Sequence, residues 1–199
     1  MPYFGYCLRS VFLLDILIFS LSASFIIMIT LKIISAKRKK AIIKSKPKLP
    51  TKGFRLFYSD EKGTNQENNV IYSKLLRSEK YNIQGKPDFI FESKKNDLVI
   101  VELKSGEIRE LTSPYKSDLM QLCAYFIIVE ELYKSPKYGL IIYKDFMFVV
   151  KNASFLRKKV ISVIKDMRDM LKTGEQEANS SFITCKNCIC KGTVCEYCD

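Results

Sequence analysis

Histidine and tryptophan are both absent from this 199-residue sequence. Without histidine, any metal site or proton transfer must use carboxylates, thiolates, amines or phenols rather than an imidazole. The sequence also has no internal repeat and no low-complexity tract, which excludes a repeat architecture. The length therefore suits one folded domain with an appendage.

Acidic residues are scarce in the first quarter of the chain. Residues 1–52 carry ten Lys or Arg and one acidic residue, a net charge of +9 out of +12 for the whole chain. Residues 53–199 carry twenty-three basic and twenty acidic residues, which leaves a net charge of only +3. Because this larger part is only mildly basic, any nucleic-acid function must be argued from a motif and not from composition.

A long uncharged run lies near the N-terminus. Residues 11–34 are almost wholly apolar and residues 16–31 contain no charge, which is close to the ~20 residues that span a bilayer. A cleaved signal peptide is the alternative, but Arg9 is a weak basic start and the positive cluster follows the run instead. We therefore predict a single-pass membrane anchor over residues 1–35.

The charges that follow this run predict its orientation. Seven basic residues come directly after it, against one before it: Lys37, Arg38, Lys39, Lys40, Lys44, Lys46 and Lys48. The positive-inside rule then places the rest of the chain in the cytoplasm, with these residues beside anionic lipid headgroups. We expect residues 36–52 to be a basic linker, stiffened near its end by Pro47 and Pro50.

Residues 85–104 have the pattern of a β-hairpin, because two apolar runs flank a polar loop. If Phe91 faces Val99 across that loop, Asp88 falls opposite Glu102. Directly opposed residues lie roughly 5 Å apart at Cβ. The predicted register therefore brings two carboxylates together at one end of an apolar hairpin.

These carboxylates predict a metal site. Lys104 lies two residues beyond Glu102 and so on the same strand face. Two close carboxylates repel unless a cation joins them, and Mg²⁺ or Mn²⁺ suits one or two carboxylates, waters and phosphate oxygens. The predicted reaction is metal-assisted phosphodiester hydrolysis, with Lys104 orienting the water or neutralising charge. The alternative is an ordinary half-exposed strand with a surface ion pair.

A helix is predicted over Lys116–Lys134, where apolar residues recur at helical spacing. Gln121 and Tyr125 are four residues apart and share one face of it, where they can hold a phosphate, a base or the lysine. Cys123 is expected to be a small core residue.

The remaining pattern predicts a mixed β-sheet flanked by helices, an α+β arrangement. The last helix is expected to bury one apolar face, formed by Val160, Ile161, Ile164, Met167 and Leu171. The other expected elements are strands at Phe54–Tyr58, Tyr138–Tyr143 and Phe146–Lys151, and helices at Asn68–Ser78 and Leu156–Leu171.

Three motifs in this order resemble the PD-(D/E)xK nucleases of the RecB type: Gly85-Lys86-Pro87-Asp88, Glu102-Leu103-Lys104 and Gln121-Leu122-Cys123-Ala124-Tyr125. Within that superfamily, the chain looks most like the CRISPR-associated exonuclease Cas-four and related Dna-two/Cas-four domains, over roughly residues 54–198. The resemblance implies a restriction-endonuclease-like fold, with the nuclease domain over residues 53–180.

The resemblance also implies roles for the site residues. Asp88 and Glu102 would hold the metal, Lys104 would serve the nucleophilic water, and Gln121 with Tyr125 would complete the site. The implied activity is exonuclease action on single-stranded DNA or DNA ends, with protein partners in DNA repair or CRISPR adaptation. Such nucleases often have a further acidic residue or histidine upstream, and the acidic candidates here are Glu67 and Asp60.

The segment 181–199 is rich in cysteine and predicts a second metal centre. Such a cluster in a reducing compartment is more typical of metal binding than of disulfides, and both zinc and an iron–sulfur cluster take four cysteines. The resemblance favours a 4Fe–4S cluster, although the family's cysteine upstream of the nuclease core has no counterpart here. The expected ligands are therefore Cys185, Cys188, Cys195 and Cys198, with Cys190 as a substitute for one of them.

Three functions are compatible with the sequence. The favoured one is a membrane-anchored, metal-dependent deoxyribonuclease with a cysteine-bound metal centre. The second is a catalytically inactive, membrane-tethered nucleic-acid-binding or scaffold protein on the same fold. The third is a structural metal-knuckle protein whose hairpin acids are merely surface residues.

Overall fold

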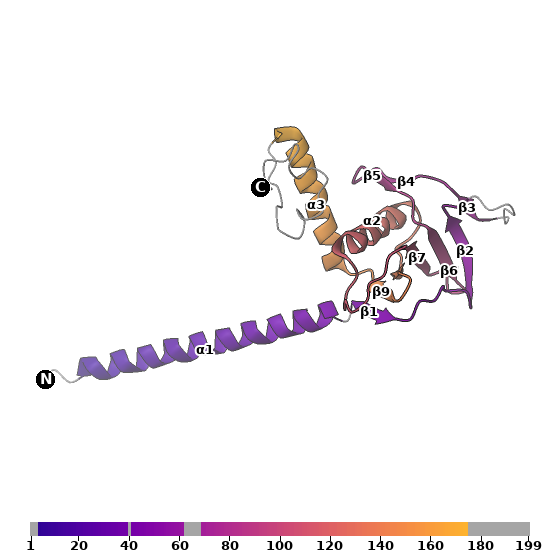
Figure 1. Cartoon of the computed structure of the whole chain (residues 1–199). Coiled ribbons are helices and arrows are strands. Elements are labelled where there is room, and N and C mark those ends of the chain that lie inside the picture. Colours follow the sequence, from indigo (N-terminus) through magenta and orange to yellow (C-terminus); the bar gives the residue numbers. More distant parts are fainter. Residues whose placement is uncertain (1–3, 40, 62–68, 175–199) are drawn as a thin grey trace, which may run out of the picture. The chain divides into compact units, whose positions relative to one another are not determined.

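The computed structural model of the chain describes residues 4–39, 41–61 and 69–174 (Figure 1). The cysteine-rich segment and Glu67 therefore lie outside the described residues. The chain divides into two compact units, Met1–Arg157 and Lys158–Asp199.

The first element is α1, a 36-residue helix over Phe4–Lys39. Its segment Ile18–Ser35 is long and apolar enough to cross a membrane by length and composition, and none of it is buried. The hydroxyls of Ser22, Ser24 and Thr30 donate to carbonyls of the preceding turn, so these polar groups are satisfied inside the helix. A signal sequence near the N-terminus passes the same test of length and composition.

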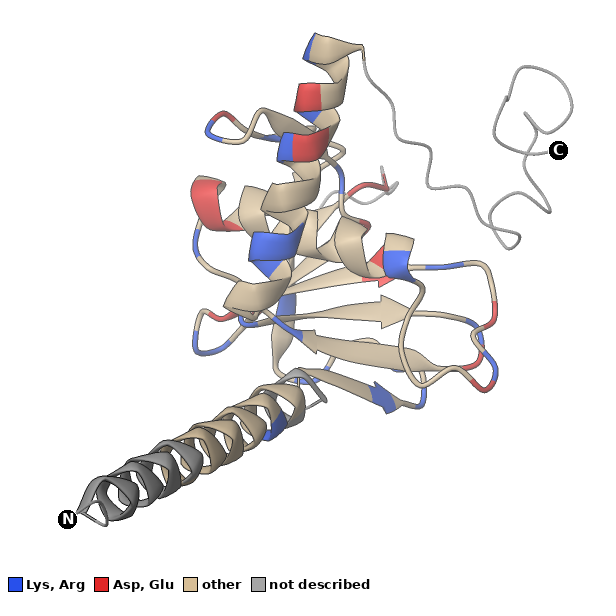
Figure 2. Cartoon of the chain, turned by 90° about the vertical axis from the view of Figure 1, so that its left-hand side faces the viewer, with Lys and Arg blue, Asp and Glu red and all other residues tan. Residues whose placement is uncertain are grey.

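A seven-stranded mixed sheet forms the centre of the first unit. The β7–β8 and β2–β3 pairs are parallel and the other pairs are antiparallel. Charged residues lie mostly on loops and helices, whereas the strands are largely uncharged (Figure 2). The spatial order of the strands is β1 (Ile42–Ser45), β9 (Met147–Lys151), β8 (Tyr138–Ile142), β7 (Leu98–Leu103), β6 (Phe89–Ser93), β2 (Phe54–Ser59) and β3 (Ile71–Tyr72).

The helix α2, Lys116–Leu132, connects the parallel strands β7 and β8 and packs against both (Figure 1). Its Leu122 rests on the bare backbone of Gly139 in β8, where an added Cβ would lie 2.7 Å from Leu122 Cδ1. Cys123 is fully buried beside it, and burial raises the pKa of its thiol to about 12, which keeps it unreactive. The predicted mixed sheet with flanking helices is thus confirmed.

The expected helix over Asn68–Ser78 is wrong. Residues 71–72 form β3, and β4 (Leu76–Ser78) pairs with β5 (Ile83–Gly85) in a separate two-stranded sheet. Asn69 and Ser73 both have positive φ angles, which no right-handed helix contains. Within β4, buried residues alternate with exposed ones, which is the period of a strand and not of a helix.

The last described element is α3, Ser154–Thr173, which confirms the predicted final helix. Leu156 and Val160 are buried. Met167 and Leu171, which were expected to face inward, are 58% and 85% exposed.

Residues Ile42–Ser45 form β1, although they lie inside the segment expected to be a linker. β1 pairs with β9 over four residues, and Lys44 Nζ donates to the carbonyl oxygens of Arg109 and Leu111 at 2.7 and 2.9 Å. Part of the segment expected to be a linker, including the basic residue Lys44, therefore forms an edge of the sheet.

A chain that begins at residue 53 is expected to be less stable than one that begins at residue 36. Loss of β1 removes its ladder hydrogen bonds and both bonds from Lys44, together worth about 2 to 4 kcal/mol. Thermal unfolding followed by circular dichroism should show a fall in Tm of about 5 to 15 °C. Equal Tm values for the two chains would mean that β1 contributes nothing to the fold.

Candidate functional site

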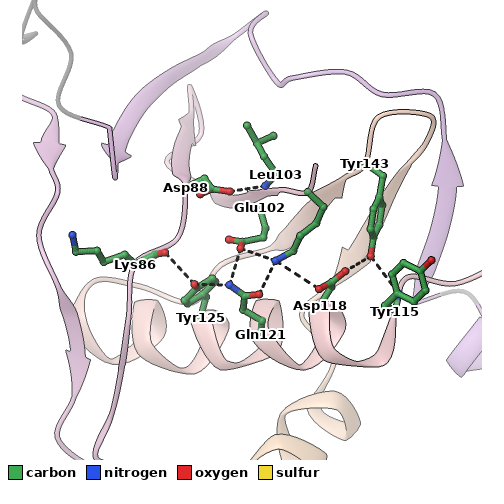
Figure 3. A network of polar contacts seen from close by, with 10 residues as sticks. Lys86, Asp88, Glu102, Leu103, Tyr115, Asp118, Gln121, Tyr125 and Tyr143 are labelled. Carbon is green, nitrogen blue, oxygen red and sulfur yellow. Dashed lines mark hydrogen bonds and ion pairs between the residues drawn. The ribbon is translucent and has the colours of Figure 1, made fainter. Parts of the chain in front are cut away.

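The β6–β7 hairpin has the predicted register. Phe91 pairs with Val99 and Phe89 with Val101, so Asp88 directly precedes β6 at the end of the hairpin where β7 finishes. There, Asp88 Oδ2 accepts a 2.6 Å hydrogen bond from the backbone N–H of Leu103 (Figure 3). The hairpin itself thus fixes the position of the Asp88 carboxylate.

Glu102 is the central carboxylate of the site and is only 5% exposed. Its Oε1 accepts hydrogen bonds from Lys104 Nζ at 3.0 Å and from Gln121 Nε2 at 2.7 Å. Its Oε2 is buried and has no hydrogen-bond partner among the described residues. Burial, assisted by the charge of Asp88, raises the pKa of Glu102 above its ordinary value, because both effects disfavour the charged form.

Lys104 follows β7 directly, and three acceptors surround its ammonium. Nζ lies 2.7 Å from Gln121 Oε1, 3.0 Å from Glu102 Oε1 and 3.6 Å from Asp118 Oδ1. Its side chain is 21% exposed. The ammonium is therefore held in place yet still accessible from solvent.

Gln121 and Tyr125 connect the hairpin to α2. Gln121 Nε2 donates to Tyr125 Oη as well as to Glu102, and Tyr125 Oη donates to the carbonyl oxygen of Lys86 at 3.0 Å. Gly85 makes this approach possible, because a Cβ there would lie 2.6 Å from the Tyr125 ring. The structure thus joins Glu102, Lys104, Gln121 and Tyr125 in one polar network, while Asp88 lies beside it, bonded to the Leu103 N–H (Figure 3).

Two members of the network were not predicted from the sequence, Asp118 and Tyr143. Asp118 lies in the first turn of α2, and its Oδ2 accepts a hydrogen bond from Tyr143 Oη. The sequence did carry a signal for Asp118, which stands three residues before Gln121 and so on the same helix face. Tyr143 had no such signal, because its place depends on the pairing of β8 with β7.

Of the two upstream acidic candidates, only Asp60 is described. It follows β2, its backbone N–H donates to the carbonyl oxygen of Asp88 at 3.0 Å, and its carboxylate pairs with Lys86 Nζ at 3.1 Å. The chain therefore passes the end of the hairpin at Asp60. Although Asp60 Oδ1 lies close to Lys86 Nζ, it is a buried oxygen without a hydrogen-bond partner among the described residues, as Glu102 Oε2 is.

The donor set fits a hard divalent ion. The described residues bring together no group of three or more His, Cys, Asp or Glu side chains able to hold a metal. Mg²⁺, however, usually takes only one or two protein carboxylates and completes its shell with water and phosphate oxygens. Glu102 Oε2, a buried oxygen without a partner in the described part of the chain, is the kind of atom that such a cation would satisfy.

Comparison with known proteins gives one family. The family model described as "PD-(D/E)XK nuclease superfamily" matches residues 35–199. Among solved structures, the one titled "Crystal structure of SSO0001" is similar at 16% identity and a TM-score of 0.42, over 96% of this chain and 79% of that chain. No curated protein matches this sequence.

Proposed function

This chain belongs to the PD-(D/E)XK nuclease superfamily, and we propose that it is a metal-dependent deoxyribonuclease that hydrolyses phosphodiester bonds at the end of the β6–β7 hairpin. The observation that carries the proposal is the buried carboxylate of Glu102. One of its oxygens is held by Lys104 and Gln121, while the other has no hydrogen-bond partner in the described residues. A structural carboxylate would use both oxygens, as Glu92 in the same hairpin does.

Asp88 and Glu102 are the residues that would hold Mg²⁺ or Mn²⁺. Asp88 is fixed by the backbone of Leu103, and Glu102 by Lys104 and Gln121, so neither carboxylate must be reordered when a cation binds. When bound, the metal would lower the pKa of a coordinated water and withdraw charge from the phosphoryl oxygens.

Lys104 acts on the charge of the site, and Gln121 and Tyr125 fix the orientation of its side chains. Lys104 brings a positive charge beside the carboxylates, where it can offset negative charge that develops on the phosphodiester. Gln121 accepts from Lys104 and donates to Glu102 and Tyr125, which fixes which way its amide faces. Tyr125 then ties this arrangement to the Lys86 carbonyl.

The finer activity that we propose is exonuclease action on single-stranded DNA or DNA ends, in DNA repair or CRISPR adaptation. Its support is the resemblance of the three motifs to Cas-four-type nucleases of the RecB group. The product ladder from an end-labelled strand tests it, because an endonuclease would yield internal fragments from the start.

We further propose that α1 anchors the chain in a membrane with its C-terminal part in the cytoplasm. The support is the apolar segment Ile18–Ser35 and the basic residues that follow it. Recovery of the chain in the soluble fraction, or cleavage after the apolar segment, would contradict this topology.

For the segment 181–199 we propose a 4Fe–4S cluster, with zinc as the alternative. The support is the cysteine spacing, in which the proposed ligands are Cys185, Cys188, Cys195 and Cys198 with Cys190 as a substitute. Metal analysis and the visible absorption spectrum of anaerobically purified protein distinguish iron, zinc and neither.

The experiment that tests the nuclease is cleavage by the full chain in detergent, on end-labelled single-stranded DNA with Mg²⁺ or Mn²⁺. We expect the wild-type chain to cleave the DNA, EDTA to abolish this cleavage, and the Glu102→Gln variant to show none. DNA binding without cleavage under any metal would favour the inactive, membrane-tethered nucleic-acid-binding protein. Equal cleavage by the Glu102→Gln variant would refute the site.

A further inference from the structure

The start of α2 is capped in an unusual way. Its N-cap residue, Tyr115, makes no side-chain capping bond. Instead, the hydroxyl of Tyr143 accepts a hydrogen bond from the Tyr115 N–H at 3.3 Å and donates one to Asp118 Oδ2. In a capping box, the acidic residue at the third helical position binds the N-cap N–H directly. Here, a hydroxyl from the end of β8 stands between the two.

This arrangement leaves the second oxygen of Asp118 free to act elsewhere. Asp118 Oδ1 lies 3.6 Å from Lys104 Nζ, and the Asp118 side chain is 16% exposed. Tyr143 is 2% exposed, and its ring packs edge-to-face against Phe148 and Tyr115. A buried tyrosine, packed against two aromatic rings, therefore sets the direction of the Asp118 carboxylate.

Asp118 and Glu102 lie on either side of the lysine ammonium (Figure 3). Without Asp118, Glu102 would be the one carboxylate paired with the ammonium in the described part of the chain, beside the neutral acceptor Gln121 Oε1. Glu102 Oε2 has no partner there. An ammonium drawn to that oxygen would occupy the position that a divalent cation needs. The charge of Asp118 opposes this movement.

We propose that Asp118, oriented by Tyr143, is a positioning residue that holds Lys104 away from the cation position of Glu102. This inference rests on the proposed nuclease site. Asp118 touches neither metal nor DNA in this role, and its whole effect passes through Lys104.

The test is a double-variant cycle on the full chain in detergent. Asp118→Asn keeps the shape and removes the charge; it should lower kcat about 10- to 50-fold, with KM for DNA unchanged, and weaken Mn²⁺ binding several-fold. Tyr143→Phe keeps the ring contacts and should lower kcat about 3- to 10-fold. In a Lys104→Met background, Asp118→Asn should change both kcat and the Kd for Mn²⁺ by less than about twofold, because the residue it acts through is gone.

Two controls separate this role from a structural one. Asp97 directly precedes β7, at the end of the strand opposite to Glu102. Asp97→Asn removes its ion pair with Lys137 and should leave kcat and Mn²⁺ binding unchanged. If Asp118→Asn has the same effect with and without Lys104, the positioning role is refuted. If the wild-type chain cleaves no DNA, the proposed function fails, but Mn²⁺ binding and the Tm of the four proteins of the cycle (wild type, Asp118→Asn, Lys104→Met and the double variant) still decide the inference. Additive effects of the two substitutions would overturn it.

Discussion

Replacing Glu102 with glutamine is expected to lower the rate of metal-dependent DNA cleavage roughly a thousandfold without unfolding the protein. Glutamine preserves the volume, and its amide oxygen can accept the bonds from Lys104 and Gln121. It removes the negative charge that a divalent cation requires. Single-turnover cleavage and Mn²⁺ titration of the full chain measure both effects.

The same substitution should make the metal-free protein more stable than the wild type, by an amount that grows as pH rises. Burial and Asp88 raise the pKa of Glu102 above 4.5, so ionising this group costs more in the folded than in the unfolded state. The wild type therefore loses stability as pH increases from 4.5 through the raised pKa, whereas the glutamine variant does not. Urea unfolding at several pH values should show the difference between the two proteins growing over that interval.

Glu92 provides the matched control because it is the other buried glutamate of the hairpin. Hydrogen bonds from Lys134 and Arg55 hold both of its oxygens, and the Lys134 bond in particular lowers its pKa. Glu92→Gln should reduce stability at neutral pH, where the charged form is favoured, and leave the cleavage rate per folded molecule unchanged. If both glutamine variants lost activity equally, Glu102 would have no special role.

The hairpin and its carboxylates could be predicted because the information is local. Alternation along two short strands sets which residues share a face, and a short polar loop sets the register that places Asp88 near Glu102. Gln121 and Tyr125 followed from helical spacing in the same way. These positions depend on backbone periods and not on the rest of the fold.

The parts that could not be predicted depend on contacts between distant segments. Tyr143 reaches Asp118 only because β8 lies beside β7. β1 was expected to be part of a linker because the segment around it is strongly basic. Its partner strand, β9, lies more than one hundred residues away in the sequence. Segment 69–78 has apolar residues at helical spacing, but positive φ angles at Asn69 and Ser73 redirect the chain into short strands.

Replacing Lys104 with methionine should separate catalysis from metal binding. The ammonium offsets the charge of Glu102, which the charge of Asp88 also disfavours, so its loss leaves these two carboxylates repelling each other at a largely buried position. We expect the cleavage rate to fall about 100- to 1000-fold, and the Tm of the metal-free protein to fall by about 3 to 8 °C. Added Mn²⁺ should then raise the Tm more than it does in the wild type, because the cation replaces the missing positive charge.

Lys137→Met is the appropriate control, since the Lys137 side chain forms an exposed ion pair with Asp97 and no other ion pair with the residues that the structure describes. Its loss should change neither Tm nor rate appreciably. Glu102→Gln combined with Lys104→Met should lose the Mn²⁺ response again, because the carboxylate that we propose as the cation ligand is gone. A Lys104→Met variant that no longer responds to Mn²⁺ would mean that the lysine builds the cation position itself. Retention of the response with loss of the rate would assign Lys104 to the chemical step, and Asp88 and Glu102 to the metal.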